Sequence, residues 1–171
     1  MGLIRLNNQS LTNVTALPSA VVNSIDTGKV LQVVNASVTA RQDLTITANV
    51  YVDTNLTLNI TPSSATSKIL VIGNFVHGNT GGNYPTYMRV ARTLSGTQTA
   101  ITTKLQHFGY VANGENNTGS CSCTVLDDPQ TTSQLTYTAQ ISRVNNGTAH
   151  FNGNYYQTGF ESFLTAIEIA G

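Results

Sequence analysis

Charge is the most obvious shortage in this sequence. Only 9% of its 171 residues are Asp, Glu, Lys or Arg, with eight basic residues against eight acidic ones, whereas soluble domains average about 25%. This balance excludes a protein that binds nucleic acid through a basic surface, because such proteins neutralise phosphates with an excess of Lys and Arg. We therefore expect no nucleic-acid partner.

Long apolar runs and cysteines are also scarce. No run approaches the roughly 20 apolar residues of a membrane span, and the first ten residues, MGLIRLNNQS, lack the apolar core of a signal peptide. We expect no membrane partner.

Two cysteines cannot form a disulfide framework. On a strand, Cys121 and Cys123 lie about 6.5–7 Å apart on one face, too far for an easy disulfide, so they are interpreted as small core residues.

Neutral polar residues take the place of charge. The chain has 26 Thr, 18 Asn, 13 Ser and 9 Gln. Thr, Val, Ile and Tyr favour strands, and Asn and Ser favour turns. Because 40% of the residues are hydrophobic, the chain can bury a core of its own. The composition predicts one all-β domain with an uncharged polar surface.

Alternation of apolar and polar residues from Lys29 onward predicts nine or ten strands. The segment 68–78, KILVIGNFVHG, is apolar on both faces, which predicts a central strand covered on both sides. The spacing of the strands favours an antiparallel two-sheet jelly-roll sandwich of about 8–10 strands. The other predicted strands are 29–39, 44–53, 56–60, 88–94, 101–105, 121–125, 135–141, 151–156 and 163–169.

Residues 1–27 differ from the rest, because their apolar residues follow no steady period. We expect an N-terminal arm over 1–27 and a jelly-roll domain over 28–171, with a mobile tail as the alternative. Each large apolar side chain left in water forgoes about 1.5–3 kcal/mol of burial, which favours an arm that attaches to another protein surface. The residues expected to make this attachment are Leu3, Ile4, Leu6, Leu11 and Leu17.

No catalytic or metal-binding motif stands out. His77, His107 and His150 lie in separate segments, and neither H-x-x-x-H nor C-x-x-C occurs. Asp127–Pro129 is typical of a turn, and Asp53–Asn55 lacks the glycine and terminal glutamate of an EF-hand loop. We expect no enzyme activity, no cofactor and no metal site.

Tyrosines gather in or beside the Gly/Asn-rich segments. Tyrosine in such loops can stack on sugars or line an interface, as it does in antibody paratopes. A structural role at the end of the sandwich is the alternative, and the two stay open here. These possible surface-recognition residues are Tyr84, Tyr87, Tyr110, Tyr155 and Tyr156.

Four blocks of this sequence resemble bacteriophage virion proteins, both small structural proteins and the terminal domains of tail fibres. The blocks are GKVLQVVNASVT at 28–39, DTNLTLNITPSSATSKILVIGNF at 53–75, LDDPQTTSQLTYTAQI at 126–141 and SFLTAIEIAG at 162–171. The piece over 61–71 is the most specific, and AIEIA at 166–170 is the second. Together the blocks fall within residues 28–171.

The resemblance implies a jelly-roll domain that assembles as a homotrimer on a phage particle, without cofactor or catalysis. The leading interpretation is a capsid decoration (cement) protein on the virion surface, assembled in the cytoplasm of the bacterial host. Its partners would be itself and the major capsid protein or another virion protein. The alternative is the receptor-binding knob of a tail or head fibre that recognises a host-surface glycan. The absence of a shaft domain ahead of the arm favours decoration.

Overall fold

The computed structural model describes residues 28–79, 85–105, 117–153 and 158–171. These residues form ten strands and no helix, so no helix among them is long and apolar enough to cross a membrane. The strands are β1 (Val30–Val38), β2 (Gln42–Ile46), β3 (Val52–Ile60), β4 (Lys68–Asn79), β5 (Thr86–Leu94), β6 (Thr97–Ala100), β7 (Asn117–Asp127), β8 (Leu135–Arg143), β9 (Gly147–Phe151) and β10 (Ser162–Ile169).

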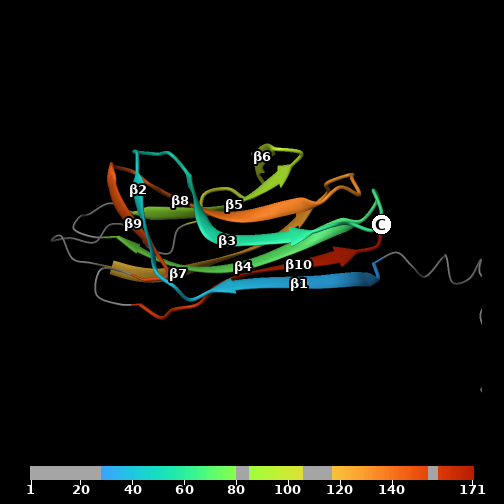
Figure 1. Cartoon of the computed structure of the whole chain (residues 1–171), viewed down its shortest axis with the longest axis horizontal. Helices are drawn as coiled ribbons and strands as arrows, with labels where there is room; N and C mark the ends of the chain where they lie inside the picture. Colours follow the sequence, from blue (N-terminus) through green and yellow to red (C-terminus); the bar gives the residue numbers. More distant parts are fainter. Residues whose placement is uncertain (1–27, 80–84, 106–116, 154–157) are drawn as a thin grey trace, which may run out of the picture.

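The strands form two facing antiparallel sheets (Figure 1). The six-stranded sheet has the order β1-β10-β4-β9-β2, with β7 on the other side of β4, and the four-stranded sheet has the order β3-β8-β5-β6. The pairing is nested: β1 pairs with β10, β2 with β9, β3 with β8, β4 with β7 and β5 with β6. A long antiparallel ribbon rolled up in this way is a jelly roll. The predicted fold class is confirmed.

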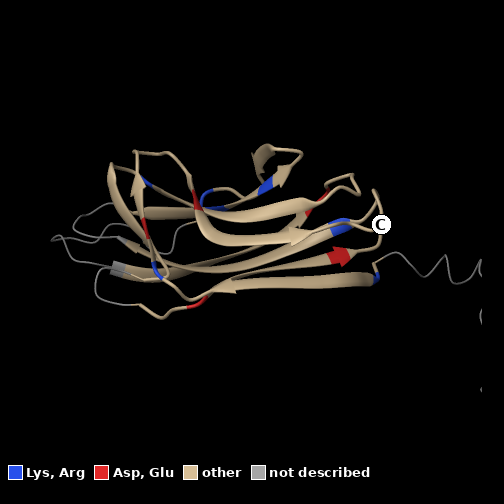
Figure 2. Cartoon of the chain, in the orientation of Figure 1, with Lys and Arg blue, Asp and Glu red and all other residues tan. Residues whose placement is uncertain are grey.

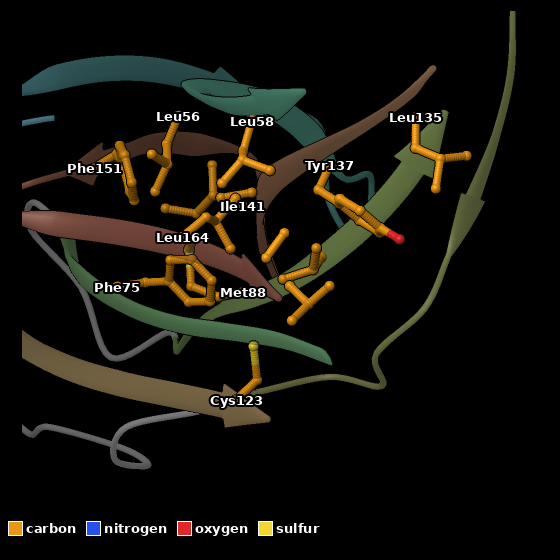
Figure 3. Close-up of a cluster of buried hydrophobic side chains, with 14 of the residues drawn as sticks. Leu56, Leu58, Phe75, Met88, Cys123, Leu135, Tyr137, Ile141, Phe151 and Leu164 are labelled. Carbon is orange, nitrogen blue, oxygen red and sulfur yellow. The ribbon is translucent and has the colours of Figure 1, made fainter. Parts of the chain in front are cut away.

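The core lies between the two sheets and is built by the predicted alternation. Leu56, Leu58 and Ile60 of β3 are buried in one cluster with the aromatic rings of Phe75 and Tyr137. Figure 3 shows Leu56 and Leu58 on one side of this core and Phe75 on the other. A β-carbon at position 73 of β4 would collide with the Phe75 ring, so any larger residue would force the ring to shift. The core is thus filled by large side chains that pack directly over Gly73.

The segment 44–53, predicted as one strand, is two strands in the structure. β2 ends at Ile46, and a turn with Asn49 at φ 62° leads into β3 at Val52. The turn is held by hydrogen bonds from the Asn49 amide to the Arg143 carbonyl (2.7 Å) and from the Val50 amide to the Thr47 carbonyl (2.9 Å). The alternation survives the turn because β2 and β3 belong to opposite sheets that face the same core.

Two further predicted strands are displaced along the chain. Ser95 and Gly96 form the turn after β5, so β6 begins at Thr97, and the predicted strand 101–105 keeps only a bridge between Leu105 and Met88. The predicted strand 151–156 begins earlier, as β9, which ends at Phe151. Turn geometry rather than apolar periodicity sets both boundaries.

The two ends of the sandwich carry different parts of the chain (Figure 1). At one end, the Gly28 amide donates to the Ala170 carbonyl (2.9 Å), so residues 1–27 depart beside the last strand. At the opposite end lie the flanks of the segments 80–84, 106–116 and 154–157, where Asn79 pairs with Asn117 and His77 pairs with Phe151.

Candidate assembly surface

The outer face of the six-stranded sheet carries a row of apolar side chains. Register aligns Val33 of β1 with Ile167 of β10, Ile167 with Leu70 of β4, and Leu70 with Leu126 of β7. The two ends of the row, Val33 and Leu126, are 59% and 54% exposed, and the two central residues are half-buried. The row crosses four strands, about 14 Å at the usual strand spacing.

More apolar residues flank this row toward the end where Gly28 lies. Val30 and Leu31 of β1 are exposed there, beside the half-buried Ile169 of β10. Charged residues are absent from the middle of β1, β10 and β4 and occur near the strand ends (Figure 2). We call Val30, Leu31, Val33, Leu70, Leu126, Ile167 and Ile169 the apolar face.

The outer face of the four-stranded sheet is polar instead. The Gln140 amide nitrogen donates to Asp53 (2.5 Å) and to Gln98 (2.9 Å), and the Gln140 oxygen accepts from Arg89 (2.6 Å). The Arg89 guanidinium lies 3.8 Å from the centroid of the Tyr51 ring. These groups satisfy one another's hydrogen bonds, and Gln140 is itself buried among them, so the two outer faces of the sandwich differ in kind.

The central position of β4 is confirmed, but its two faces differ. Strand β4 is paired on both edges, with β7 on one side and with β10 and then β9 on the other. Its side chains Ile69, Val71 and Phe75 are buried in the core, as expected. On the outer side, Leu70 and Ile72 are only half-buried. No other described part of the chain covers this outer side, contrary to the expectation of a strand covered on both sides.

A buried glutamate lies at the Gly28 end of the same sheet. Glu168 of β10 is fully buried, and its carboxylate accepts hydrogen bonds from the Ser63 amide (2.7 Å), the Ser63 hydroxyl (2.6 Å) and the Gln32 amide nitrogen (2.5 Å). Gln32 also donates to the Thr61 carbonyl (2.8 Å). We call Gln32, Thr61, Ser63 and Glu168 the Glu168 cluster. It ties β1, β10 and the β3–β4 connection together.

The hydrogen bonds of this cluster keep Glu168 ionised. Burial alone would raise the pKa of this carboxyl, but the hydrogen bonds donated by Ser63 and Gln32 outweigh burial and lower the pKa to about 2. Most of the carboxylate's lone pairs are directed at donors, which is the arrangement that makes a buried charge tolerable. The cluster therefore stabilises the strand pair β1–β10, which carries five of the seven residues of the apolar face.

A second buried network joins the two sheets. Asp127 of β7 accepts hydrogen bonds from the Tyr137 hydroxyl (2.7 Å) and from Arg92 (2.6 Å), both of which belong to the four-stranded sheet. Burial, with the Asp127 carboxylate adding to it, raises the pKa of Tyr137 well above its ordinary value. The phenol thus stays a donor. This network fixes the end of β7 next to Leu126 of the apolar face.

Most of the predicted site residues lie outside the described residues. Leu3, Ile4, Leu6, Leu11 and Leu17 of the arm all do, and so do Tyr84, Tyr110, Tyr155 and Tyr156. The remaining predicted tyrosine, Tyr87, is half-buried on β5, with the Lys104 ammonium 4.1 Å from its ring centroid. Tyr87 therefore lies on the polar outer face.

The two thiols and the two described histidines have structural surroundings rather than a shared ligand site. Cys121 and Cys123 are free cysteines of β7 that pack against the core. Burial raises the pKa of Cys121 to about 12 and that of Cys123 to about 11. His77 shares a hydrogen bond with Thr86 (2.5 Å), and His150 shares one with Asp43 (2.7 Å). His107 lies outside the described residues.

The two acidic turn candidates are also used structurally. Asp127 belongs to the network above, and Asp128 forms an ion pair with Lys68 (3.2 Å). Thr54, between Asp53 and Asn55, is buried and donates to the Ala139 carbonyl (2.8 Å). No group of three or more His, Cys, Asp or Glu side chains that could hold a metal occurs within the described ranges.

Sequence reasoning missed the apolar face. The available signal is that the segment 68–78 is apolar on both of its faces, Leu70 included. Val33, Leu126 and Ile167 lie far away in the sequence, and only the register of the sheet brings them beside Leu70.

No family model matches the chain, and no curated protein matches it. Among solved structures, the chain is similar to the infectious bursal disease virus VP2 subviral particle, with 14% identity over 84% of this chain and a TM-score of 0.46. It spans about a third (34%) of that VP2 chain. It is also similar to Eiger TNF from S. frugiperda (10% identity, 77% of this chain, 94% of that one, TM-score 0.42) and to murine APRIL (9% identity, 81% and 100%, TM-score 0.37).

Proposed function

We propose that this chain is a structural, non-catalytic protein of a phage particle: a homotrimeric capsid decoration (cement) protein on the outer surface. The observation that carries the proposal is the contrast between the two outer faces of the sandwich. One is polar and internally hydrogen-bonded, and the other presents an apolar row that no other described part of the chain covers. The resemblance of four sequence blocks to phage virion proteins supports the setting.

The apolar face suits contact between copies of the chain. Exposed contiguous apolar residues on a soluble domain mark interaction sites, because burying them releases water at about 25 cal/mol for each Å². Lys68 lies beside the face, in register with Ile169, but its charge is balanced by the ion pair with Asp128 (3.2 Å), so two identical faces meet without net repulsion. In the proposed trimer the three apolar faces surround the threefold axis, and the polar faces of the four-stranded sheets point outward.

This arrangement also gives the arm a role. Residues 1–27 leave the domain at Gly28, at the end of the sheet where the apolar face lies. Three arms would therefore leave a trimer from the same end. We propose that their first apolar residues, Leu3, Ile4 and Leu6, contact the major capsid protein or another virion protein beneath.

Charge placed on the apolar face tests the assembly. The double variant Val33→Asp/Leu126→Asp changes two exposed residues, so the single chain should still fold, but burying aspartates in an interface is costly. Light scattering should give three times 18.2 kDa for the wild type and 18.2 kDa for the variant. The matched control is Val50→Asp, because Val50 is 48% exposed but lies in the β2–β3 turn. A monomeric wild type at micromolar concentration, or a trimeric double variant, contradicts the proposal.

A fibre knob that binds a host glycan is the second candidate. The observation in its favour is that the described flanks of segments 80–84, 106–116 and 154–157 lie at one end of the sandwich, opposite Gly28. These segments contain Tyr84, Tyr110, Tyr155 and Tyr156. Copy number distinguishes the two candidates: gel densitometry against the major capsid protein should give hundreds of copies per particle for decoration and a few dozen or fewer for a fibre.

A further inference from the structure

Strand β7 is an unusually regular edge strand. It pairs with β4 through eleven consecutive residue pairs, from Asn117–Asn79 to Asp127–Ile69, without a register shift. No other described strand pairs with it, so its second edge is free among the described residues. Free edges present unpaired amide and carbonyl groups that can pair with another chain. Before Asp127, the sequence of β7 has no charge and no proline to prevent this.

The other edges of the two sheets carry such protection. Strand β1 has a register shift between Val30 and Gln32, and β3 has one between Asp53 and Thr57. Strands β2 and β6 have only five and four residues. Irregularity and shortness are the usual means by which edge strands avoid pairing with other chains. Among the described edges, β7 alone is long, regular and uncharged up to its last residue.

A groove follows this free edge. It has a volume of about 460 Å³ and is lined by residues 122–125 of β7 and, on the opposite side, by Ile101, Thr102, Thr103 and Leu105 after β6. The opposite wall is fixed, because the Leu105 amide and carbonyl both bond to Met88 of β5 (2.8 and 2.9 Å). No lining residue is charged. Free backbone groups beside an uncharged groove suit an extended, neutral segment, which is the mode of β-strand addition.

We propose that residues 11–17 from the arm of a neighbouring subunit add to the free edge of β7 as an extra strand; this rests on the proposed trimer. The sequence of this segment, Leu-Thr-Asn-Val-Thr-Ala-Leu, has no charge, glycine or proline, and Thr12, Val14 and Thr15 favour strands. Pro18 ends the segment. Residues 1–10 then remain available for the proposed contact with another virion protein.

The placement of the two edges favours a neighbour as the donor. Gly28 leads into β1, and β1 and β7 are the opposite edges of the four long strands β1-β10-β4-β7. A donor at one edge and an acceptor at the other make a head-to-tail contact, which closes into a ring when the rotation is threefold. The ten residues between Gly28 and Leu17 can extend over about 35 Å, enough to reach an adjacent subunit.

Hydrogen exchange on the full-length protein tests the docking. Val14→Pro removes an amide and disfavours strand pairing at the centre of the segment. Peptides covering 119–127 should exchange at least tenfold faster in Val14→Pro than in wild type, and the matched control Ser24→Pro should leave them unchanged. If Val14→Pro is a trimer with wild-type exchange over 119–127, the docking is wrong while the proposed trimer stands.

Crosslinking identifies the donor chain. In a Cys121→Ala/Cys123→Ala background, chains with Val14→Cys are co-expressed with chains that carry Thr124→Cys, at an exposed position beside the groove. A short bis-maleimide should join the two kinds of chain. Thr99→Cys on β6, exposed but on the other sheet, should give no product. No product with Thr124→Cys, or linkage only when both cysteines are on one chain, overturns the proposal.

Discussion

Glu168 makes the stability of this domain dependent on pH in a way that can be measured. Its carboxyl has a pKa of about 2 in the folded chain, against an ordinary value of 4.5. Each pKa unit corresponds to about 1.4 kcal/mol, so this difference in pKa contributes about 3 kcal/mol to the free energy of folding. Because the folded pKa is the lower one, this stabilisation is complete above about pH 4.5 and is lost as the pH falls toward 2.

The substitution Glu168→Gln removes this contribution. The amide nitrogen of glutamine would face donors from Ser63 or Gln32, so we expect the variant to be about 2–3 kcal/mol less stable at pH 7. Its stability should also fall less steeply between pH 4.5 and 2.5 than that of the wild type. The matched control is Glu161→Gln, since Glu161 is exposed just before β10. Its pH profile should follow the wild type.

Denaturant unfolding at pH 7, 4.5, 3.5 and 2.5, at one fixed protein concentration, measures these differences. The fixed concentration matters because the proposed association of subunits would add to the apparent stability. Parallel loss of stability in wild type and Glu168→Gln over this range would refute the reasoning, because it would place the acid-sensitive group elsewhere.

Three further changes probe the core. Gly73→Ala should destabilise the domain by about 1–3 kcal/mol in denaturant unfolding, because the new methyl collides with the Phe75 ring; wild-type stability would show that the ring has room to move. Tyr137→Phe leaves Asp127 without one of its two side-chain donors and should cost about 1–3 kcal/mol by the same assay, whereas a neutral result would mean that water replaces the phenol. Iodoacetamide at pH 8 should label Cys123 roughly a hundredfold more slowly than an ordinary thiol, because burial raises its pKa to about 11, and labelling at the ordinary rate would contradict this burial.

The architecture was predictable because alternation reports directly on burial. Leu56, Leu58 and Ile60 alternate with Thr57 and Asn59, and the structure buries the first three and exposes the other two. The same signal could not locate the turn at Asn49. The side chains before and after this turn face one core from two sheets, so the apolar period continues across a break in the backbone.

The apolar face could not be predicted, because it depends on the register of strand pairing, and the sequence does not reveal which strands pair or in what register. Val33, Leu70 and Ile167 become neighbours only through the pairing of β1, β10 and β4.

The Glu168 cluster likewise joins residues that are far apart in the sequence. Three of the sequence blocks that resemble phage proteins supply Gln32, Ser63 and Glu168, and the structure brings these residues into hydrogen-bond contact. The most specific parts of the resemblance thus contribute to a fold-stabilising contact.

The nested pairing of the strands also sets the order in which this chain can fold. Strand β10 lies between β1 and β4, although more than 120 residues separate β1 from β10 along the chain. At about 5–20 residues per second, the ribosome needs several seconds or more to deliver β10 after β1 has emerged. During that time the apolar face cannot form, because β10, which carries Ile167 and Ile169, is still missing. Contacts this distant in sequence also close slowly, on a scale of milliseconds to seconds. In the proposed trimer, topology would therefore prevent premature association of half-made chains through this face, and assembly would begin only after β10 has been inserted.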